Sequence, residues 1–235
     1  MRKMAASLPF ALTQNIAYDK QTAKIMDITL RKNSNCIDIG CHKGEVLEQI
    51  LELAPKGQHF GFEPIPYFFQ YLNSAFPNNC TFHQVALSDA EGEIEFNYVT
   101  TNPAYSGIEQ REYPKEEEIT KIKVETQRLD QIIPNEVFID FIKIDVEGAE
   151  LQVLKGATEL IKRCRPYIVF EHGLGAADKY GTKPSDIYNL LVTECGLKLS
   201  TLKGFIKEEE ALTAEEFDQQ FYQKINYYFI AYSEK

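Results

Sequence analysis

The fold of this 235-residue chain is constrained most strongly by one repeated pattern: a short apolar run, a turn, and then an amphipathic segment. Residues 35–39 form the clearest apolar run, and after a glycine turn the apolar residues of 46–51 recur at helical spacing. Similar apolar runs occur at 58–63, 81–87, 138–144 and 166–170. Strands that alternate with helices pair in parallel, with the helices on the faces of the sheet. The pattern therefore predicts an α/β fold built on a mostly parallel sheet.

Two later runs, at 197–202 and 226–232, bring the predicted sheet to seven strands. A helix is predicted over Ser185–Cys195, with Ser185 as its N-cap and Gly196 as its stop. The sheet is thus expected to be flanked by helices along most of the chain.

The chain is predicted to have one main domain and an N-terminal addition. We expect residues 1–33 to form a helical segment that packs on the core or covers the site, and residues 34–235 to form a Rossmann-like domain. A hairpin and a loop at about 90–126 are expected as an insertion in that domain. The segment around Tyr18 and the loop at 100–118 are expected to shape the pocket for a second substrate.

The acidic balance of the chain excludes several classes of partner. The chain has 25 Lys and Arg against 35 Asp and Glu, a formal net charge of −10. Binding to nucleic acid needs clustered positive charge that displaces counterions from phosphates. We therefore expect no nucleic-acid partner, and a neutral or cationic small molecule as substrate. No apolar stretch approaches the length that spans a bilayer.

The cysteine pattern indicates a reducing compartment. The five cysteines are odd in number and scattered, and no CxxC occurs. This fits reduced cytosolic thiols better than a disulfide framework or a zinc site. An apolar run at 4–12 follows Arg2 and Lys3, but Ser7 and Pro9 interrupt it. We therefore expect no signal peptide and a cytoplasmic location.

The glycine turn at Asp38–Gly44 is the first candidate ligand-binding segment. Such a turn between a strand and a helix aims backbone N–H groups at an anion. Dinucleotide-binding turns need a second glycine where the backbone approaches a pyrophosphate, and here His42 stands at that position. The turn therefore favours a smaller anion, such as an amino-acid carboxylate. Asp38 ends a buried strand, where it either binds a cation such as an ammonium or caps the turn.

Polar side chains also end the next two predicted strands. Glu63 lies 23 residues after Gly40, at about the spacing where an acid holds the ribose hydroxyls in nucleotide-binding folds. Ser88 and Asp89 end the third strand, where an adenine amino group would find an acceptor. A polar surface turn is an equally good interpretation of Ser88 and Asp89.

The most distinctive segment is 141–150, in which an apolar strand runs into Asp145, Glu147 and Glu150. Ligands collect at the carboxyl ends of strands in open α/β sheets, so Asp145 is expected to face the ligand. Glu147 either caps the next helix or points into the cleft. Glu150 is expected to have a structural role in the first helical turn, where the helix dipole favours an acid.

Glu171 and His172 end the fifth predicted strand at the same edge of the sheet. Asp145, Glu147 or His172 could accept a proton from a substrate hydroxyl, although His172 could equally make a structural hydrogen bond. Asp145, Glu147 and Glu171 could also hold a divalent cation. No spacing requires that cation, so no metal site is predicted. Activity that survives dialysis against EDTA would exclude it.

Four segments together resemble the FkbM-type methyltransferases. They are Ile37–Gly44, Phe62–Pro64, Val85–Asp89 with Gly92, and Ile142–Glu150. The string Lys-Ile-Asp-Val-Glu-Gly-Ala-Glu at 143–150 is the most specific part, and the resemblance covers about residues 34–172. His42 departs from the Asn that members often carry at that position.

The resemblance implies a class I methyltransferase fold with an antiparallel last strand and S-adenosylmethionine as cofactor. It also implies O-methylation of a hydroxyl on a small molecule, sugar or glycolipid. The cofactor contacts would then fall at Asp38, Gly40, Cys41, His42, Gly44, Glu63, Pro64, Ser88, Asp89 and Asp145.

Two other functions remain open from the sequence. An NAD-dependent oxidoreductase could use a similar sheet, although the missing glycine at position 42 counts against it. A non-catalytic binding protein could also have kept the fold, because fold alone does not define function. The acidic residues at three strand ends favour an enzyme over a non-catalytic binding protein.

Overall fold

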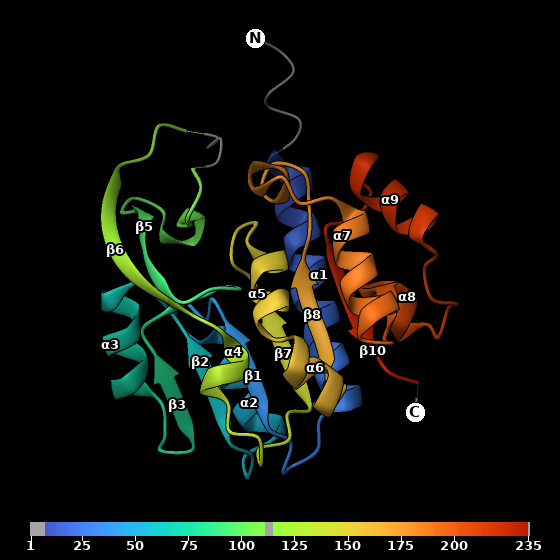
Figure 1. Ribbon diagram of the computed structural model, residues 1–235, viewed down its shortest axis with the longest axis horizontal. Coiled ribbons are helices and arrows are strands. Elements are labelled where there is room, and N and C mark those ends of the chain that lie inside the picture. The colour runs from blue at the N-terminus through green and yellow to red at the C-terminus, as the bar shows by residue number, and fades with distance from the viewer. Residues whose placement is uncertain (1–7, 111–114, 235) are drawn as a thin grey trace.

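The computed structural model describes residues 8–110 and 115–234 (Figure 1). Part of the apolar run at 4–12 and part of the loop at 100–118 therefore lie outside the described residues. The main sheet has seven strands in the order β3-β2-β1-β7-β8-β10-β9. The strands are β1 (Cys36–Ile39), β2 (His59–Phe62), β3 (Cys80–His83), β7 (Phe141–Ile144), β8 (Tyr167–Glu171), β9 (Lys198–Thr201) and β10 (Tyr228–Tyr232).

The pairing of the strands confirms the predicted fold class. Strands β1, β2, β3, β7 and β8 pair in parallel, and β10 runs antiparallel to both β8 and β9. Every residue of β1, β2 and β7 is buried, as expected for strands with helices on both faces of the sheet.

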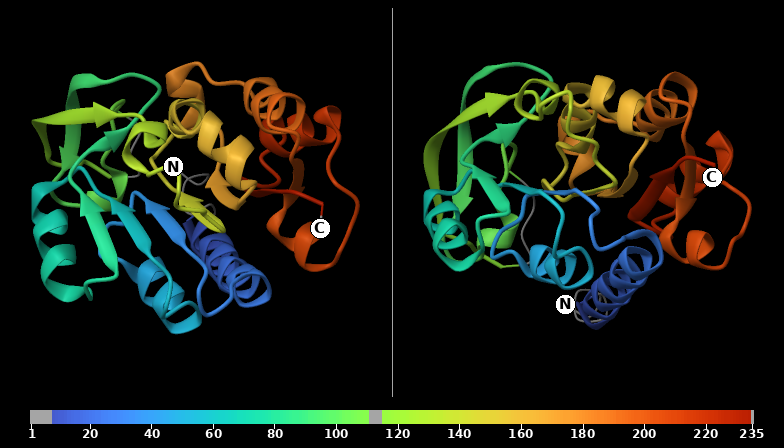
Figure 2. Two further views of the ribbon diagram at one scale, coloured as in Figure 1. Left: turned by 60° about the horizontal axis from the view of Figure 1, so that its bottom comes forward. Right: turned by 90° about the horizontal axis from the view of Figure 1, so that it is seen from below.

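Helices cover the two faces of the sheet unequally (Figure 2). One face carries α1 (Leu8–Thr29), α2 (Glu45–Leu53) and α8 (Leu202–Ile206), whose buried side chains share a core cluster. The other face carries α4 (Leu129–Ile132), α5 (Glu150–Gly156), α6 (Thr158–Cys164), α7 (Pro184–Tyr188) and α9 (Ala214–Tyr222). Helix α3 (Pro66–Ala75) lies beside β3 at the edge of the sheet. None of the described helices is long and apolar enough to cross a membrane.

A second sheet of three strands stands at this edge, in the order β4-β6-β5. It contains β4 (Ala86–Leu87), β5 (Gly92–Val99) and β6 (Ile119–Gln127), and β5 and β6 form the expected antiparallel hairpin. The single strand predicted at 81–87 is wrong, because the chain leaves the main sheet after His83. Ala86 and Leu87 then pair with Thr126 and Gln127 of the hairpin. One apolar run therefore supplies buried side chains to two sheets.

The helix predicted at Ser185–Cys195 also differs in detail. Helix α7 begins at Pro184 with Lys183 as its N-cap, and a π-helix continues over Asn189–Glu194. Proline at the first helical position explains the earlier start, because its missing N–H has no intrahelical partner there. Helices α8 and α9 were not predicted from the sequence.

Candidate active site

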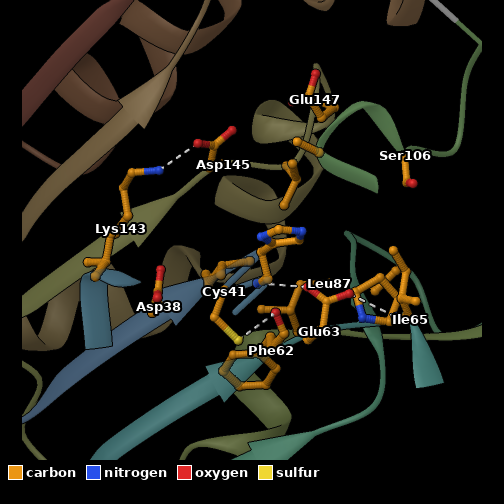
Figure 3. Close-up of a pocket in the computed structure, with 18 of the residues that line it drawn as sticks. Asp38, Cys41, Phe62, Glu63, Ile65, Leu87, Ser106, Lys143, Asp145 and Glu147 are labelled. Carbon is orange, nitrogen blue, oxygen red and sulfur yellow. Dashed lines mark hydrogen bonds and ion pairs between the residues drawn. The ribbon is translucent and has the colours of Figure 1, made fainter. Parts of the chain in front are cut away.

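A cavity of about 520 Å³ opens at the carboxyl ends of β1, β2 and β7 (Figure 3). This volume suits a small-molecule ligand. Most of the predicted site residues line it, namely Asp38, Gly40, Cys41, His42, Glu63, Pro64, Asp145 and Glu147. Helix α1 contributes Asp19, Thr22 and Met26, and the hairpin with its loop contributes Phe96, Pro103, Ala104, Ser106 and Ile108. Both segments that were expected to shape a second-substrate pocket therefore reach the cavity.

Close backbone contacts fix the glycine turn between two strand ends. The Gly40 N–H donates to the Phe62 oxygen at 2.9 Å, and the Asp145 N–H donates to the Ile39 oxygen at 3.0 Å. Gly40 has a φ of +76°, and an added Cβ would lie 1.9 Å from the Asp145 backbone oxygen. Only glycine fits this position without displacing the chain. Gly44 lies outside the cavity lining, where an added Cβ would meet the Phe76 ring at 2.4 Å.

His42 and Glu63 are joined through the backbone. His42 has a φ of +49°, in the left-handed region that His and Asn tolerate better than most residues. Its N–H donates to Glu63 Oε2 at 2.9 Å, and the Ile65 N–H donates to Glu63 Oε1 at 2.9 Å. These two bonds hold the Glu63 carboxyl at the cavity wall, and burial raises its pKa to about 7. Burial also lowers the pKa of His42, whose ring packs on Phe68 with centroids 4.2 Å apart.

A buried charge network occupies the other end of the cavity. Lys143 lies directly opposite Asp38 in the pairing of β1 with β7. The Lys143 ammonium donates to Asp145 Oδ2 at 2.8 Å, and the Tyr228 hydroxyl donates to the same oxygen at 2.6 Å. Burial opposes the charge of Asp145, but Lys143 and these hydrogen bonds outweigh it and hold the pKa of Asp145 below its usual value. Asp145 is therefore a stable carboxylate.

Asp38 is the least satisfied of these groups. The residue is 2% exposed, and among the described residues its Oδ2 has no hydrogen-bond partner. Burial raises the pKa of Asp38 to about 7, although the nearby Lys143 charge acts in the opposite direction. A buried carboxylate oxygen of this kind is costly unless a cation or donor binds it. This oxygen fits the ammonium that the sequence pattern suggested.

The turn after β7 is strained and is held by Glu150. Glu147 has a φ of +58° and Gly148 a φ of +110°. Glu150 Oε1 accepts from the Val146 N–H at 3.2 Å and from the Gly148 N–H at 3.1 Å. Residues in such conformations persist only where their surroundings enforce them, and they gather at functional sites. Glu150 has this structural role, and Glu147 is held at the cavity wall.

Asp145, Glu147 and Glu171 come together as the sequence suggested. One ligand oxygen from each lies within 4.8 Å of the others. Hard divalent cations bind such oxygens, but acidic groups also cluster without a metal, so the cluster alone does not define a metal site. Dialysis against EDTA would remove a cation held by these three carboxylates, so activity that survives the dialysis excludes a required metal.

Ser88 and Asp89 do not line the cavity. The turn into the hairpin carries them away, and the Ser88 hydroxyl donates to Asp89 Oδ1 at 3.3 Å near the surface. Val85, Ala86 and Leu87 line the cavity instead. The predicted adenine contact of Ser88 and Asp89 thus has no support in this geometry.

His172 also lies outside the cavity lining. Its ring stacks on Phe217 and Phe221 with centroids 5.7 and 4.6 Å away, on the face of the sheet opposite α1. Among the described residues, neither ring nitrogen has a hydrogen-bond partner. Burial lowers the pKa of His172 to about 4, although Asp186 opposes this shift. The arrangement gives no support to His172 as a general base.

Replacing His172 by Phe is expected to keep the catalytic rate within a few-fold and to stabilise the fold in mild acid. The unfolded chain protonates His172 near its ordinary pKa of about 6.5, whereas the folded chain resists protonation. Stability is therefore complete above that pH and is lost as the pH falls towards 4. The loss amounts to about 3 kcal/mol once the pH is below about 4, and about 2 kcal/mol of it is present at pH 5. Denaturant unfolding at about pH 7.5 and about pH 5 measures the effect, and a hundredfold loss of rate would restore the role as a base.

Two important residues were missed from the sequence. Lys143 lies inside an apolar strand, and its side chain is only 8% exposed. A lysine within an apolar run is rarely buried without a partner, so its position in the sequence could have indicated a site residue. Tyr228 reaches the cavity from β10, and nothing in its local sequence distinguishes it from the other tyrosines.

A seven-stranded sheet of this order, with a ligand cavity at the carboxyl ends of its central strands, defines the class I methyltransferase fold. The model of the Methyltransferase FkbM domain matches residues 38–199, and the chain belongs to this family.

Three known proteins illustrate the similarity. The chain is 28% identical over 162 residues to the 2-O-methyltransferase NoeI of Sinorhizobium fredii, covering 60% of this chain and 65% of that protein. It is 27% identical over 162 residues to the methyltransferase sdnD of Sordaria araneosa, covering 55% of this chain and 62% of that protein. Both matches thus span less than two thirds of the relative. The crystal structure of methyltransferase FkbM from Methylobacillus flagellatus shares the fold at 16% identity and a TM-score of 0.55, covering 86% of this chain and 44% of that one.

Proposed function

We propose that this chain transfers a methyl group from S-adenosylmethionine to a hydroxyl of a small molecule, sugar or glycolipid. The observation that carries the proposal is the meeting of Asp38, Glu63 and Asp145 around the glycine turn, at the ends of three adjacent strands. The family supports methyl transfer. The relative NoeI, whose name gives it as a 2-O-methyltransferase, supports oxygen as the attacked atom.

The residues of the cavity fit the parts of this cofactor. The Asp38 oxygen that lacks a partner suits the ammonium, and the held carboxyl of Glu63 suits the ribose hydroxyls. Ile65, Leu87 and Phe96 offer apolar walls for the adenine, in place of Ser88 and Asp89. The acids of the lining suit a cofactor with positive charge.

The proton of the accepting hydroxyl is assigned to Glu147. S-adenosylmethionine, when bound, would supply a methyl group on a sulfonium sulfur, and the sulfur would be released as a neutral thioether. The hydroxyl oxygen forms the new bond to carbon, and its proton must move to a base. Asp145 is a weak base because Lys143 and Tyr228 stabilise its charge, and His172 lies elsewhere. Glu147, held at the cavity wall by its strained turn, is the remaining candidate.

A cytoplasmic location is part of this proposal. The five cysteines are all free thiols, which supports the reducing compartment expected from their spacing.

Calorimetric titration with S-adenosylhomocysteine and with NADH tests the cofactor. S-adenosylhomocysteine is expected to bind with one-site saturation, while NADH gives no saturable heat, because a Cβ stands at position 42 where the pyrophosphate would approach. Binding of NADH alone would overturn the proposal in favour of the oxidoreductase. Binding of S-adenosylhomocysteine without transfer of an isotope-labelled methyl to any hydroxyl would favour the non-catalytic binding protein.

A further inference from the structure

The Lys143 end of the cavity holds a charge arrangement that methyl transfer itself does not need. Asp38, Lys143 and Asp145 lie on the face of the sheet that α1 covers, and Figure 3 shows Lys143 and Asp38 on the same side of the cavity. Asp19 and Thr22 of α1 line the cavity with them. This end is separated from the apolar walls formed by Ile65 and Leu87, so it suits the amino-acid part of a ligand rather than the adenine.

Positive charge is scarce in the cavity. Among the described residues that line it, Lys143 is the one lysine or arginine. The carboxylate side chains of the lining are Asp19, Asp38, Glu45, Glu63, Asp145 and Glu147. An anionic group of a ligand is repelled by these acids, so it gains most from contact with Lys143.

Lys143 has bonding capacity for such a group. An ammonium has three N–H donors, and the described residues accept one of them, at Asp145 Oδ2. The side chain is 8% exposed, so further donors are shielded from bulk water. The neighbouring Tyr228 ring, with its centroid 5.3 Å from the ammonium, stabilises the charge but accepts no ionic bond.

The start of α2 is the competing place for an anion. Backbone N–H groups at a helix start attract anions, and the sequence pattern favoured this place for a carboxylate. In the structure the first turn of α2 already contains Glu45 and Glu48, and Glu45 lines the cavity. These acids already interact with the favourable field of the helix start, and the described lining has no cationic side chain there to offset them, as Lys143 offsets Asp38 and Asp145 at the other end.

We propose that Lys143 binds the carboxylate of the methionine moiety of the cofactor, opposite the Asp38 oxygen that receives its ammonium. The inference rests on the proposed use of S-adenosylmethionine. The two ends of the zwitterion then meet residues that lie opposite each other on β1 and β7. Lys143 is thus a residue that selects amino-acid-bearing cofactors, in addition to holding Asp145.

Removing the carboxylate from the ligand and the ammonium from the protein tests this contact. The ligands are S-adenosylhomocysteine, its decarboxylated analogue and methylthioadenosine, which lacks the whole amino-acid end. The wild-type chain is expected to bind the decarboxylated analogue about tenfold to a hundredfold more weakly than S-adenosylhomocysteine. In Lys143→Met the dissociation constant of S-adenosylhomocysteine should rise to that of the analogue. Binding of the other two ligands should not weaken.

Two matched variants control for charge and size. Lys20→Met removes a positive charge from the exposed side of α1, outside the cavity lining, and should keep the wild-type preference for the carboxylate. Lys143→Arg keeps the charge and should keep most of the preference. If Lys143→Met does not fold, the Lys143→Met/Asp145→Asn double variant removes both charges of the buried pair and serves the same comparison.

Each other outcome has a defined meaning. An unchanged preference in Lys143→Met overturns the inference and places the carboxylate at the start of α2. Equal weakening of all three ligands also overturns it and leaves Lys143 a purely structural partner of Asp145. If the wild-type chain binds none of the ligands, the proposed cofactor itself is wrong, and that result is distinct from both.

Discussion

Replacing Gly40 by Ala is expected to destabilise the fold by on the order of 3 kcal/mol or more and to abolish cofactor binding. The added Cβ would stand 1.9 Å from the backbone oxygen of Asp145, and backbone cannot move aside as a flexible side chain can. Relief requires that the ends of β1 and β7 separate, which moves Asp38 and Asp145 apart. Denaturant unfolding measures the loss, and calorimetry with S-adenosylhomocysteine measures the binding.

Gly181 supplies the matched control. It has a φ of +68°, close to that of Gly40, but nothing lies within 4 Å of an added Cβ. Gly181→Ala therefore suffers only the cost of a left-handed backbone, about 1 kcal/mol, and should bind the cofactor normally. Equal losses in the two variants would show that the backbone conformation, and not the contact with Asp145, makes Gly40 necessary.

Replacing Glu147 by Gln is expected to lower kcat by about a hundredfold to ten-thousandfold, with S-adenosylhomocysteine affinity unchanged within a few-fold. The amide keeps the size of the side chain but cannot accept the hydroxyl proton. Steady-state kinetics with an isotope-labelled methyl donor measures kcat, and calorimetry with S-adenosylhomocysteine measures the affinity.

Glu109→Gln makes the same charge change on the exposed loop of the hairpin, outside the cavity lining, and should keep the wild-type rate. Full activity in Glu147→Gln would return the base role to Asp145. A correctly folded variant that loses cofactor affinity along with rate would instead show that Glu147 binds rather than catalyses.

The sequence predicted the central sheet well because its strands are buried on both faces. Runs such as Cys36–Ile39 and Phe141–Ile144 are apolar at nearly every position, which leaves little choice of structure. The structure of residues 81–87 was harder to predict. An apolar pattern indicates that residues are buried, but it does not indicate which sheet they join. Pairing of Ala86 and Leu87 with the hairpin depends on distant residues and has no local signal.

The lack of a local signal for strand pairing also explains why the role expected for His172 found no support. Strand β8 ends at Glu171 and His172 follows it directly, and successive side chains along a strand point to opposite faces. The register pairs Lys143 with Val169, so Asp145 and Glu171 share the face that α1 covers, while His172 faces α9. Strand alternation would have separated the two residues once the register with β7 was known. That register comes from the fold and not from either segment alone.

The contacts of α1 with the segment that leads into β10 have a consequence for the order in which the chain folds. The Tyr18 hydroxyl donates to Asn226 Oδ1 at 3.1 Å, and the Tyr227 N–H donates to the Tyr18 oxygen at 3.3 Å. These bonds lie beside Asp19 and Tyr228, which line the cavity together although they come from opposite ends of the sequence. A nascent chain cannot complete this wall of the cavity until β10 has emerged from the ribosome. The hydrogen bond from Tyr228 to Asp145, beside Lys143, is therefore one of the last contacts to form. Cofactor binding is therefore expected late in the folding of this domain, after β10 has joined the sheet.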